Sequence, residues 1–217
     1  MKRIFYISIG LLIAFLLWTA AVRFVDVQAI GPKGSCVGFS EMNQFIHRLS
    51  GVHFGLYTIT DWLGLVPVAV GFGFAILGLV QWIRRKNILK VDFTILILGG
   101  FYIVTLVAYL FFEDCVINYR PVLINGYLEA SYPSSTTLLV LCVMSTAIMQ
   151  LYRRIQNKFL QKCIIAIITT FMIFMVIGRL ISGVHWFSDI VGGILLSAAL
   201  VTMYYYVSNL KHIKRLE

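Results

Sequence analysis

The chain alternates between six long apolar runs and shorter polar segments. A helix needs about 20 mainly apolar residues to cross the hydrocarbon core of a bilayer. The runs have roughly that length, although the fourth and fifth are shorter and could be tilted or half-buried. The pattern predicts an all-α protein, a six-span transmembrane helical bundle. The expected spans are residues 4–22, 62–83, 93–112, 136–152, 162–178 and 189–209.

The composition agrees with a membrane protein, because 60% of the 217 residues are hydrophobic and 12% are charged. Such a chain is not a soluble globular protein. Six spans leave no room for a separate soluble domain, so we expect residues 1–217 to form one integral-membrane domain. The first run is expected to remain as a span, since a cleaved signal peptide there would leave an odd number of spans.

Basic residues outnumber acidic ones by 18 to 9, but their positions argue against a nucleic-acid partner. In the six-span arrangement, thirteen of the 18 fall on one side of the membrane. Lys and Arg concentrate in cytoplasmic loops, so both termini are predicted to be cytoplasmic in a multi-pass protein of the cell membrane. The thirteen are Lys2, Arg3, Arg84, Arg85, Lys86, Lys90, Arg153, Arg154, Lys158, Lys162, Lys211, Lys214 and Arg215.

The longest non-spanning segment, residues 26–60, has the pattern of an interfacial helix in its middle. Apolar side chains recur there at helical spacing, and Ser40 is a suitable N-cap. Such a helix either lies on the bilayer or serves as a binding element or lid over a lipid entrance. Asp61 is expected to begin the second span. The apolar positions of the helix are Met42, Phe45, Ile46 and Leu49.

The cysteines and histidines do not form a recognisable metal-binding pattern. No CxxC pair or His/Cys cluster occurs, so neither a metal nor another cofactor is expected. Cys36 and Cys115 both fall on the outer side, where a disulfide could form. Cys142 and Cys163 lie within spans and are interpreted as packing residues.

Two outer loops carry candidate phosphate-binding groups. Ser134 and Ser135 follow Pro133 at the start of the fourth span. The free backbone amides of a helix N-terminus attract anions, and simple helix capping is the alternative interpretation. Arg120 and Arg179 lie on the side of the membrane that basic residues avoid. Each can donate paired hydrogen bonds to phosphate oxygens.

His185 and Asp189 are four residues apart, a spacing that places both on one face of a helix. A carboxylate bonded to one imidazole nitrogen fixes the tautomer and leaves the other nitrogen free to attack. A lone interfacial histidine would need no such partner. The pair is therefore a candidate nucleophile and orienting acid, and the arginines are candidates to hold the phosphate.

Together these residues resemble the three signatures of the type 2 phosphatidic acid phosphatase superfamily. The resemblance is centred on residues 113–189, and the order and spacing of the signatures agree. The six-span layout with outward-facing motifs is also similar to that of the membrane members. The third signature matches Arg179-x5-His185-x3-Asp189 of this chain. The second signature, Pro-Ser-Gly-His, matches residues 133–136. The end of the first signature, Lys-x6-Arg-Pro, matches Arg120-Pro121.

The resemblance implies a metal-independent lipid phosphatase that works through a phosphohistidine at the extracytoplasmic side. It implies that His185 is the nucleophile and that Asp189 orients it. It also implies that the partners are a phosphorylated lipid substrate and the bilayer, and it does not indicate the oligomeric state. The implied phosphate ligands are Arg120, Arg179, Ser134 and Ser135.

The sequence departs from the signatures at four positions. Glu113 stands where the superfamily has Lys, and Thr136 stands where it has the His that protonates the leaving group. Gly178 replaces a Ser, and Ser135 replaces a Gly. The loss of a general acid typically lowers a rate by about 10²–10⁴. His47 or His53 could replace it, so the auxiliary candidates are Thr136, Glu113, His47 and His53.

Three functions remain open at this stage. A phosphatase could act on a phosphomonoester such as phosphatidate or phosphatidylglycerophosphate. It could instead act on a polyprenyl diphosphate, whose phosphate-ester leaving group needs no acid. A non-catalytic phospholipid-binding or scaffold protein is the alternative from another class. A transporter is disfavoured because the charged residues cluster at the membrane rim and not at mid-depth.

Overall fold

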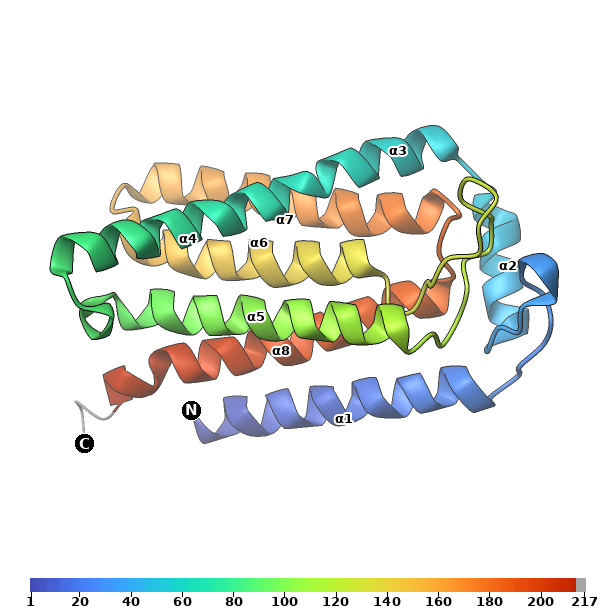
Figure 1. Ribbon diagram of the computed structural model, residues 1–217, viewed down its shortest axis with the longest axis horizontal. Coiled ribbons are helices and arrows are strands. Elements are labelled where there is room, and N and C mark those ends of the chain that lie inside the picture. The colour runs from blue at the N-terminus through green and yellow to red at the C-terminus, as the bar shows by residue number, and fades with distance from the viewer. Residues whose placement is uncertain (214–217) are drawn as a thin grey trace.

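The computed structural model describes residues 1–213, with the side chains of residues 1–210. It confirms the predicted bundle, with six helices in this part of the chain that are long and apolar enough to cross a membrane (Figure 1). Between residues 1 and 213, strand pairing is limited to three isolated bridges. The Lys211 side chain, Lys214 and Arg215, which the charge analysis counted, lie outside the described residues.

The helices follow one another with short connections, except for two longer segments at one end of the bundle. Each predicted span corresponds to one long helix or to a pair in line. The elements are α1 (Lys2–Phe24), η1 (Pro32–Gly34), α2 (Ser40–Ser50), α3 (Phe54–Leu63), α4 (Leu65–Arg85), η2 (Ile88–Lys90), α5 (Phe93–Asp114), α6 (Ser135–Arg154), α7 (Lys158–Ile181) and α8 (Phe187–Ile213).

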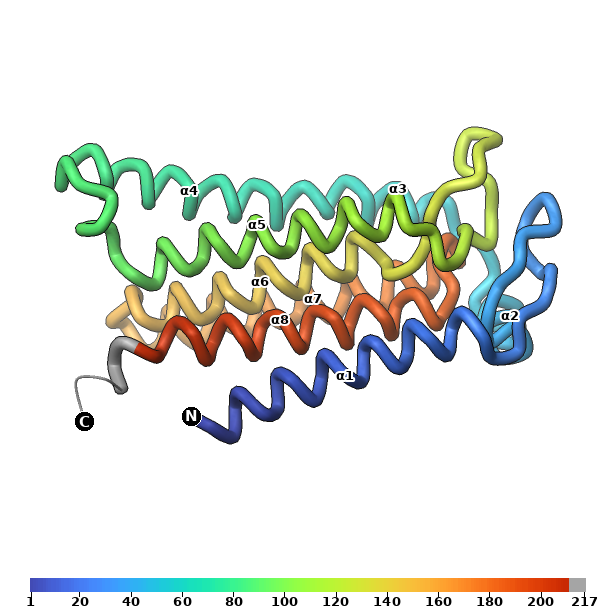
Figure 2. The backbone as a smooth tube through the Cα atoms, turned by 60° about the horizontal axis from the view of Figure 1, so that its bottom comes forward, coloured from blue at the N-terminus to red at the C-terminus, as the bar shows by residue number. Residues whose placement is uncertain are grey.

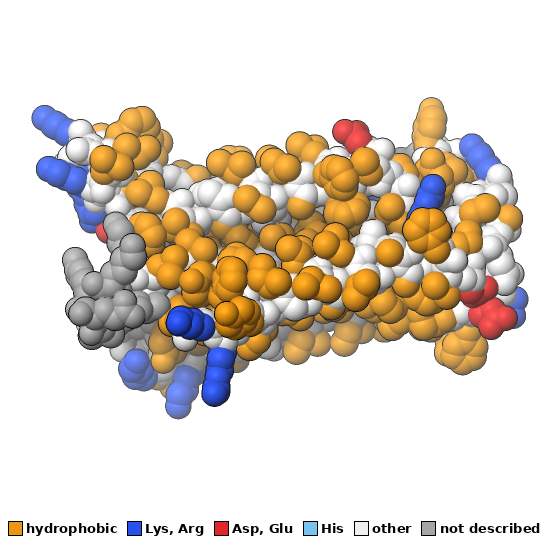
Figure 3. All heavy atoms as spheres, turned by 90° about the horizontal axis from the view of Figure 1, so that it is seen from below, with side chains coloured by type: hydrophobic (Ala, Val, Ile, Leu, Met, Phe, Trp, Pro, Cys, Tyr) orange, Lys and Arg blue, Asp and Glu red, His pale blue; other side chains and the backbone are white. Residues whose placement is uncertain are grey.

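α6 lies at the centre of the bundle and packs against α4, α5, α7 and α8. Half of its most apolar 18-residue stretch is buried, against 11% for α1, which packs on the outside against α8. Exposed hydrophobic side chains cover the middle of the bundle, and Lys and Arg gather mainly at one end (Figure 3). This distribution suits a protein whose sides face lipid.

The second span is longer than predicted, because α3 and α4 together form a helix from Phe54 to Arg85. The expectation that Asp61 begins this span is wrong, since Asp61 lies in the last turn of α3. The hydroxyl groups of Thr58 and Thr60 donate to carbonyl oxygens one turn earlier, each at 2.9 Å. Polar residues bonded in this way remain compatible with a helix. They interrupt the run of apolar residues, however, so the sequence pattern did not predict this part of the helix.

The two ends of the bundle differ in character (Figure 2). We call the end that carries the N-terminus and the last turns of α8 the terminal end. The opposite end, which we call the loop end, consists of residues 25–53, 115–134 and 182–186. Cys36 and Cys115 both lie in these segments, exposed and unbonded. The disulfide that the sequence allowed is therefore not formed.

α2 is the predicted interfacial helix, and it lies across the loop end (Figure 1). It packs against α8, and the side chain that it buries most completely is polar, since Asn43 is inaccessible to solvent. Phe45 and Leu49 point away from the bundle and are 62% and 72% exposed. An amphipathic helix in this position can present its apolar side to lipid.

The start of α2 is not capped by Ser40, as the sequence predicted, because Ser40 is already the first helical residue. Asp26 holds this turn from a distance in the chain. Its carboxylate accepts hydrogen bonds from the Glu41 amide at 2.8 Å and the Ser40 hydroxyl at 2.7 Å. These two bonds lower the pKa of Asp26 below its ordinary value. The Asp26 carboxylate thus caps the N-terminus of α2 in place of a residue next to the helix.

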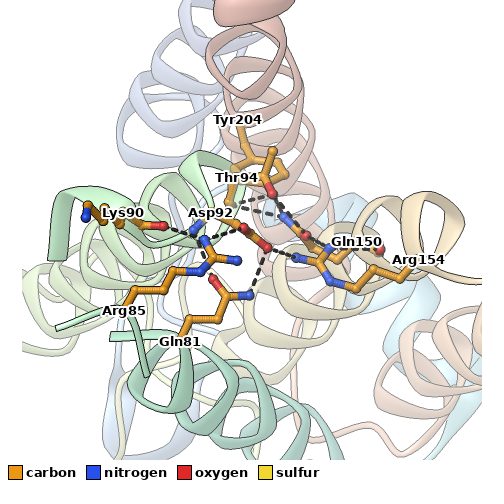
Figure 4. A network of polar contacts seen from close by, with 8 residues as sticks. All are labelled: Gln81, Arg85, Lys90, Asp92, Thr94, Gln150, Arg154 and Tyr204. Carbon is orange, nitrogen blue, oxygen red and sulfur yellow. Dashed lines mark hydrogen bonds and ion pairs between the residues drawn. The ribbon is translucent and has the colours of Figure 1, made fainter. Parts of the chain in front are cut away.

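A polar network ties α4, α5, α6 and α8 together at the terminal end (Figure 4). Asp92 accepts hydrogen bonds from Gln81 and Arg85 at 2.8 and 3.0 Å. Gln81 in turn accepts one from the Asp92 amide at 2.9 Å. The network fixes the connection between α4 and α5 to the central helix. Its other members, joined through Gln150, are Thr94, Arg154 and Tyr204.

We predict that Asp92→Ala lowers the free energy of unfolding by about 1 kcal/mol, because exposed ion pairs contribute little and the Gln81 bond somewhat more. The midpoint of thermal unfolding in detergent measures this. Burial raises the pKa of Asp92, but Gln81, Arg85 and Arg154 lower it below 3.8 on balance. The contribution of Asp92 to the free energy of unfolding should therefore be present above pH 3.8 and be lost as the pH falls through the lowered pKa.

Asp114→Ala is the matched control, since Asp114 is exposed at the other end of the same helix. This variant should unfold at the temperature of the wild type. An equal midpoint in the Asp92 variant would contradict a stabilising role for the network.

Candidate active site

The predicted site residues meet at the loop end. His185 lies in the turn between α7 and α8, and Arg179 lies in the last turn of α7. Arg120 comes from the segment between α5 and α6. All three are buried, with 3%, 1% and 9% of their surface exposed. The two loops therefore converge, as the sequence predicted.

Both arginines contact the same nitrogen of His185. Arg179 Nη2 lies 3.1 Å from His185 Nε2, and Arg120 Nη1 lies 3.5 Å from it. A guanidinium group can only donate hydrogen bonds, so Nε2 must be the acceptor and carries no proton. Its lone pair faces the space between the two cations.

The other ring nitrogen faces a serine that the sequence analysis did not single out. His185 Nδ1 lies 2.9 Å from Ser131 Oγ, and Ser131 Oγ donates to Asp189 Oδ2 at 2.6 Å. The expectation that His185 and Asp189 lie on one helix face is wrong, because α8 begins at Phe187. The histidine precedes the helix, and Ser131 bridges the histidine and the aspartate.

Asp189 is fully buried at the start of α8, and its remaining hydrogen bonds fix its position. Its Oδ2 also accepts from the Trp186 amide at 3.0 Å, and its Oδ1 accepts from Asn118 Nδ2 at 3.1 Å. Trp186 further donates its indole N–H to the Tyr119 carbonyl at 2.8 Å. The carboxylate therefore holds the turn and the loop together.

Two glycines permit the close approach of these segments. Gly183 has φ +68°, and a Cβ on it would lie 1.9 Å from the carbonyl oxygen of Gly51. A Cβ on Gly192 would lie 2.5 Å from the ring of Tyr132, the residue next to Ser131. A side chain at either position would push the turn that carries His185, or the loop that carries Ser131, away from its partner.

α2 supports the first turn of α8 through one side chain. Asn43 Oδ1 accepts from the Ser188 amide at 3.0 Å, and its Nδ2 donates to Ser188 Oγ at 2.9 Å. The same Nδ2 donates to the Gly38 carbonyl at 2.7 Å. Asn43 therefore caps α8 across 145 residues of sequence.

The carboxylates that pair with the two arginines are partly exposed to solvent. Nε and Nη1 of Arg179 have no hydrogen-bond partner among the described residues. Nη1 lies 3.7 Å from Asp61, whose side chain is 59% exposed. Arg120 Nε lies 3.0 Å from Glu129, whose side chain is 41% exposed. Buried cations with half-solvated counterions form a site suited to an anion.

The environment keeps His185 neutral. Burial lowers the pKa of its imidazole well below 6.5, and the charges of Arg120 and Arg179 lower it further. The neutral ring is the nucleophilic form. An anion between the arginines would reduce their repulsion and raise this pKa, so the charge of the ring is coupled to the ligand.

The start of α6 lies beside this group, and Ser134 is built into its contact with α8. The Ser134 amide donates to the Asp189 carbonyl at 3.0 Å, and the Ser134 hydroxyl accepts from Thr137 at 3.1 Å. The helix begins at Ser135, so its unbonded amides start there. Ser135 therefore offers a backbone donor to an anion, and the Ser134 amide does not.

None of the auxiliary candidates is hydrogen-bonded to His185 within the described part of the chain. Thr136 is half-buried in the first turn of α6, and Glu113 is exposed at the end of α5. Nε2 of His47 and of His53 bonds to backbone carbonyls, at 3.1 and 2.8 Å. Among the described residues, neither ring is hydrogen-bonded to His185 or to the arginines.

Four residues at the site were missed by sequence reasoning. Ser131 and Asn118 bond to Asp189, and Glu129 pairs with Arg120. The ring centre of Tyr57 lies 5.0 Å from the Arg179 guanidinium carbon. The first three are polar residues in the loop that carries Arg120, a signal that could have been used. The sequence around Tyr57 reads as part of an outer segment and gives no such sign.

Comparisons with known proteins identify the family and the fold. The model of the PAP2 superfamily matches residues 68–213. The crystal structure of a transmembrane PAP2-type phosphatidylglycerolphosphate phosphatase from Bacillus subtilis is similar, with a TM-score of 0.56 and 18% sequence identity. The similarity covers 92% of this chain and 94% of that one, and at this identity it concerns the fold. No curated protein sequence matches the chain.

We predict that Asn43→Ala lowers the free energy of unfolding by about 2–3 kcal/mol, because it leaves the buried Ser188 amide and Gly38 carbonyl without partners. Thermal unfolding in detergent measures the change. Gln44→Ala, which removes an exposed hydrogen bond from the same helix, is the control. Equal midpoints for the two variants would contradict the capping role of Asn43.

Proposed function

The chain belongs to the PAP2 superfamily and has the fold of a membrane phosphatase, and we propose that it hydrolyses a phosphoester or phosphoanhydride bond of a lipid. One observation carries the proposal. An unprotonated imidazole nitrogen faces two buried guanidinium groups, one of which keeps two N–H positions free of hydrogen bonds within the described residues. Such a group of donors fits a phosphate dianion, and the imidazole is placed to attack it.

The proposed reaction has two steps and uses no metal. His185 Nε2 attacks phosphorus, the N–P bond forms, and the lipid oxygen leaves with the electron pair of the P–O bond. Water then attacks the phosphohistidine, which releases inorganic phosphate and restores the imidazole. Asp189 stabilises the positive ring of the intermediate.

The proposed phosphate ligands follow from the same geometry. Arg120 and Arg179 bind the non-bridging oxygens and neutralise the charge that grows in the transition state. The amide of Ser135, at the N-terminus of α6, adds a backbone donor. Ser134 can contribute only its hydroxyl proton, because its amide is bonded to Asp189.

We propose that the site faces the extracytoplasmic side and that both termini are cytoplasmic. The basic residues between α4 and α5 and between α6 and α7 belong to the terminal end, opposite the site. The preference of Lys and Arg for cytoplasmic loops supports this orientation. The substrate phosphate would then be reached from the outer leaflet.

The replacement of the superfamily's general acid by Thr136 limits which leaving groups the site can expel. Thr136 occupies the position from which the superfamily protonates the leaving group, and a threonine hydroxyl is too weak an acid for this. A lipid diphosphate expels a phosphate ester, which leaves as an anion without a proton. We therefore propose a lipid diphosphate, such as a polyprenyl diphosphate, over phosphatidate or phosphatidylglycerophosphate.

A non-catalytic phospholipid-binding or scaffold role is the second candidate. Glu113 and Thr136, in place of two groups that the superfamily uses, favour it. The bridged pair of His185 and Asp189 argues against it, since plain binding of a phosphate needs neither residue.

The purified protein is predicted to release inorganic phosphate from at least one member of a panel of lipid phosphates and diphosphates. His185→Ala should lower this rate to background, because the nucleophile is lost. Phosphate release in detergent micelles measures it, and Gln44→Ala is the control, since Gln44 accepts an exposed hydrogen bond from Arg48 within α2. Full activity of the His185 variant would refute the mechanism, and tight lipid binding without release would favour the scaffold role.

We further predict that a lipid diphosphate turns over about 10²-fold faster than phosphatidate, the lower end of the effect of a general acid. Thr136→His should raise the rate on phosphatidate more than the rate on the diphosphate. The ratio of kcat/KM values for the two substrates, in the wild type and in the variant, measures this. Equal rates on both substrates in the wild type would refute the proposed preference.

A further inference from the structure

Ser131 is the one polar group between the proposed nucleophile and the carboxylate that orients it. It is 3% exposed, and its hydroxyl oxygen lies 2.9 Å from His185 Nδ1 and 2.6 Å from Asp189 Oδ2. No direct hydrogen bond joins the histidine and the aspartate among the described residues. The hydrogen-bonded path from Asp189 to the ring therefore runs through this hydroxyl.

The direction of both hydrogen bonds is fixed. Because the arginines make Nε2 an acceptor, the single ring proton lies on Nδ1, which donates to Ser131 Oγ. The Ser131 hydroxyl must then direct its own proton to Asp189, and the short distance of 2.6 Å fits a bond to a carboxylate. Hydrogen bonds in such a chain polarise one another.

We propose that Ser131 is a positioning residue that transmits the charge of Asp189 to His185. This inference rests on the proposed function. When Nε2 bonds to phosphorus, the ring becomes positively charged. The hydrogen bond from Nδ1–H to Ser131 Oγ then becomes stronger, and the polarised hydroxyl in turn strengthens its own hydrogen bond to the Asp189 carboxylate. No proton leaves its atom in this step. Without the hydroxyl, the ring would lose its hydrogen-bonded link to that counterion.

Ser131→Ala is expected to lower kcat about 10–100-fold, by analogy with the loss of hydrogen-bond partners that orient metal-binding histidines. KM should change less than about 3-fold, because the arginines remain in place. Ser131→Thr keeps the hydroxyl and should recover activity to within about tenfold of the wild type. Ser197→Ala, which removes another buried serine hydroxyl, in α8, should change neither constant.

Combining Ser131→Ala with a substitution of Asp189 distinguishes a positioning role of Ser131 from a general loosening of the site. If Ser131 acts through Asp189, then Ser131→Ala should cost little more in a protein that already carries Asp189→Asn, since residues that act as a unit are not additive. A loosened site would instead raise KM and add its effect to that of the second substitution. The midpoint of thermal unfolding shows whether each variant is folded. If Ser131→Ala is not folded, Ser131→Cys replaces it in the same measurements.

The outcomes distinguish this inference from the proposed function. No phosphate release by the wild type from any lipid in the panel would remove the function and the inference together. An active wild type with an inactive His185→Ala, but with unchanged kcat in folded Ser131→Ala, would overturn the inference alone. A raised KM with additive losses would also overturn it.

Discussion

Two guanidinium groups meet at one imidazole nitrogen in a place nearly closed to water, and the loop end is organised around that contact. Like charges repel strongly in such surroundings. The carboxylates paired with them, Asp61 and Glu129, are half in solvent and compensate only in part. Only a rigid frame can hold the arginines there, and the six apolar helices supply it.

The frame works through contacts between distant segments. Asn43 from α2 fixes the first turn of α8, and Asp189 in that turn fixes the loop that carries Arg120. α3 adds Tyr57 and Asp61 on the other side of Arg179. The match to the family model begins only at residue 68. Residues that precede this match thus shape a site whose signatures lie entirely within it.

The sequence was sufficient for the parts of the fold and site that depend on composition and fixed motifs. Apolar runs located the six spans, and the motif residues proved to converge. The start of α3 was missed because hydroxyl groups bonded to their own helix interrupt the apolar pattern. The role of Ser131 could not be read, since it is defined by partners 54 and 58 residues away.

The reach of Asn43 across 145 residues has a consequence for biosynthesis. A ribosome delivers α8 after the elements that precede it, and the cap that Asn43 provides can form only then. The candidate site is therefore completed late, when α8 docks beside segments translated at the outset.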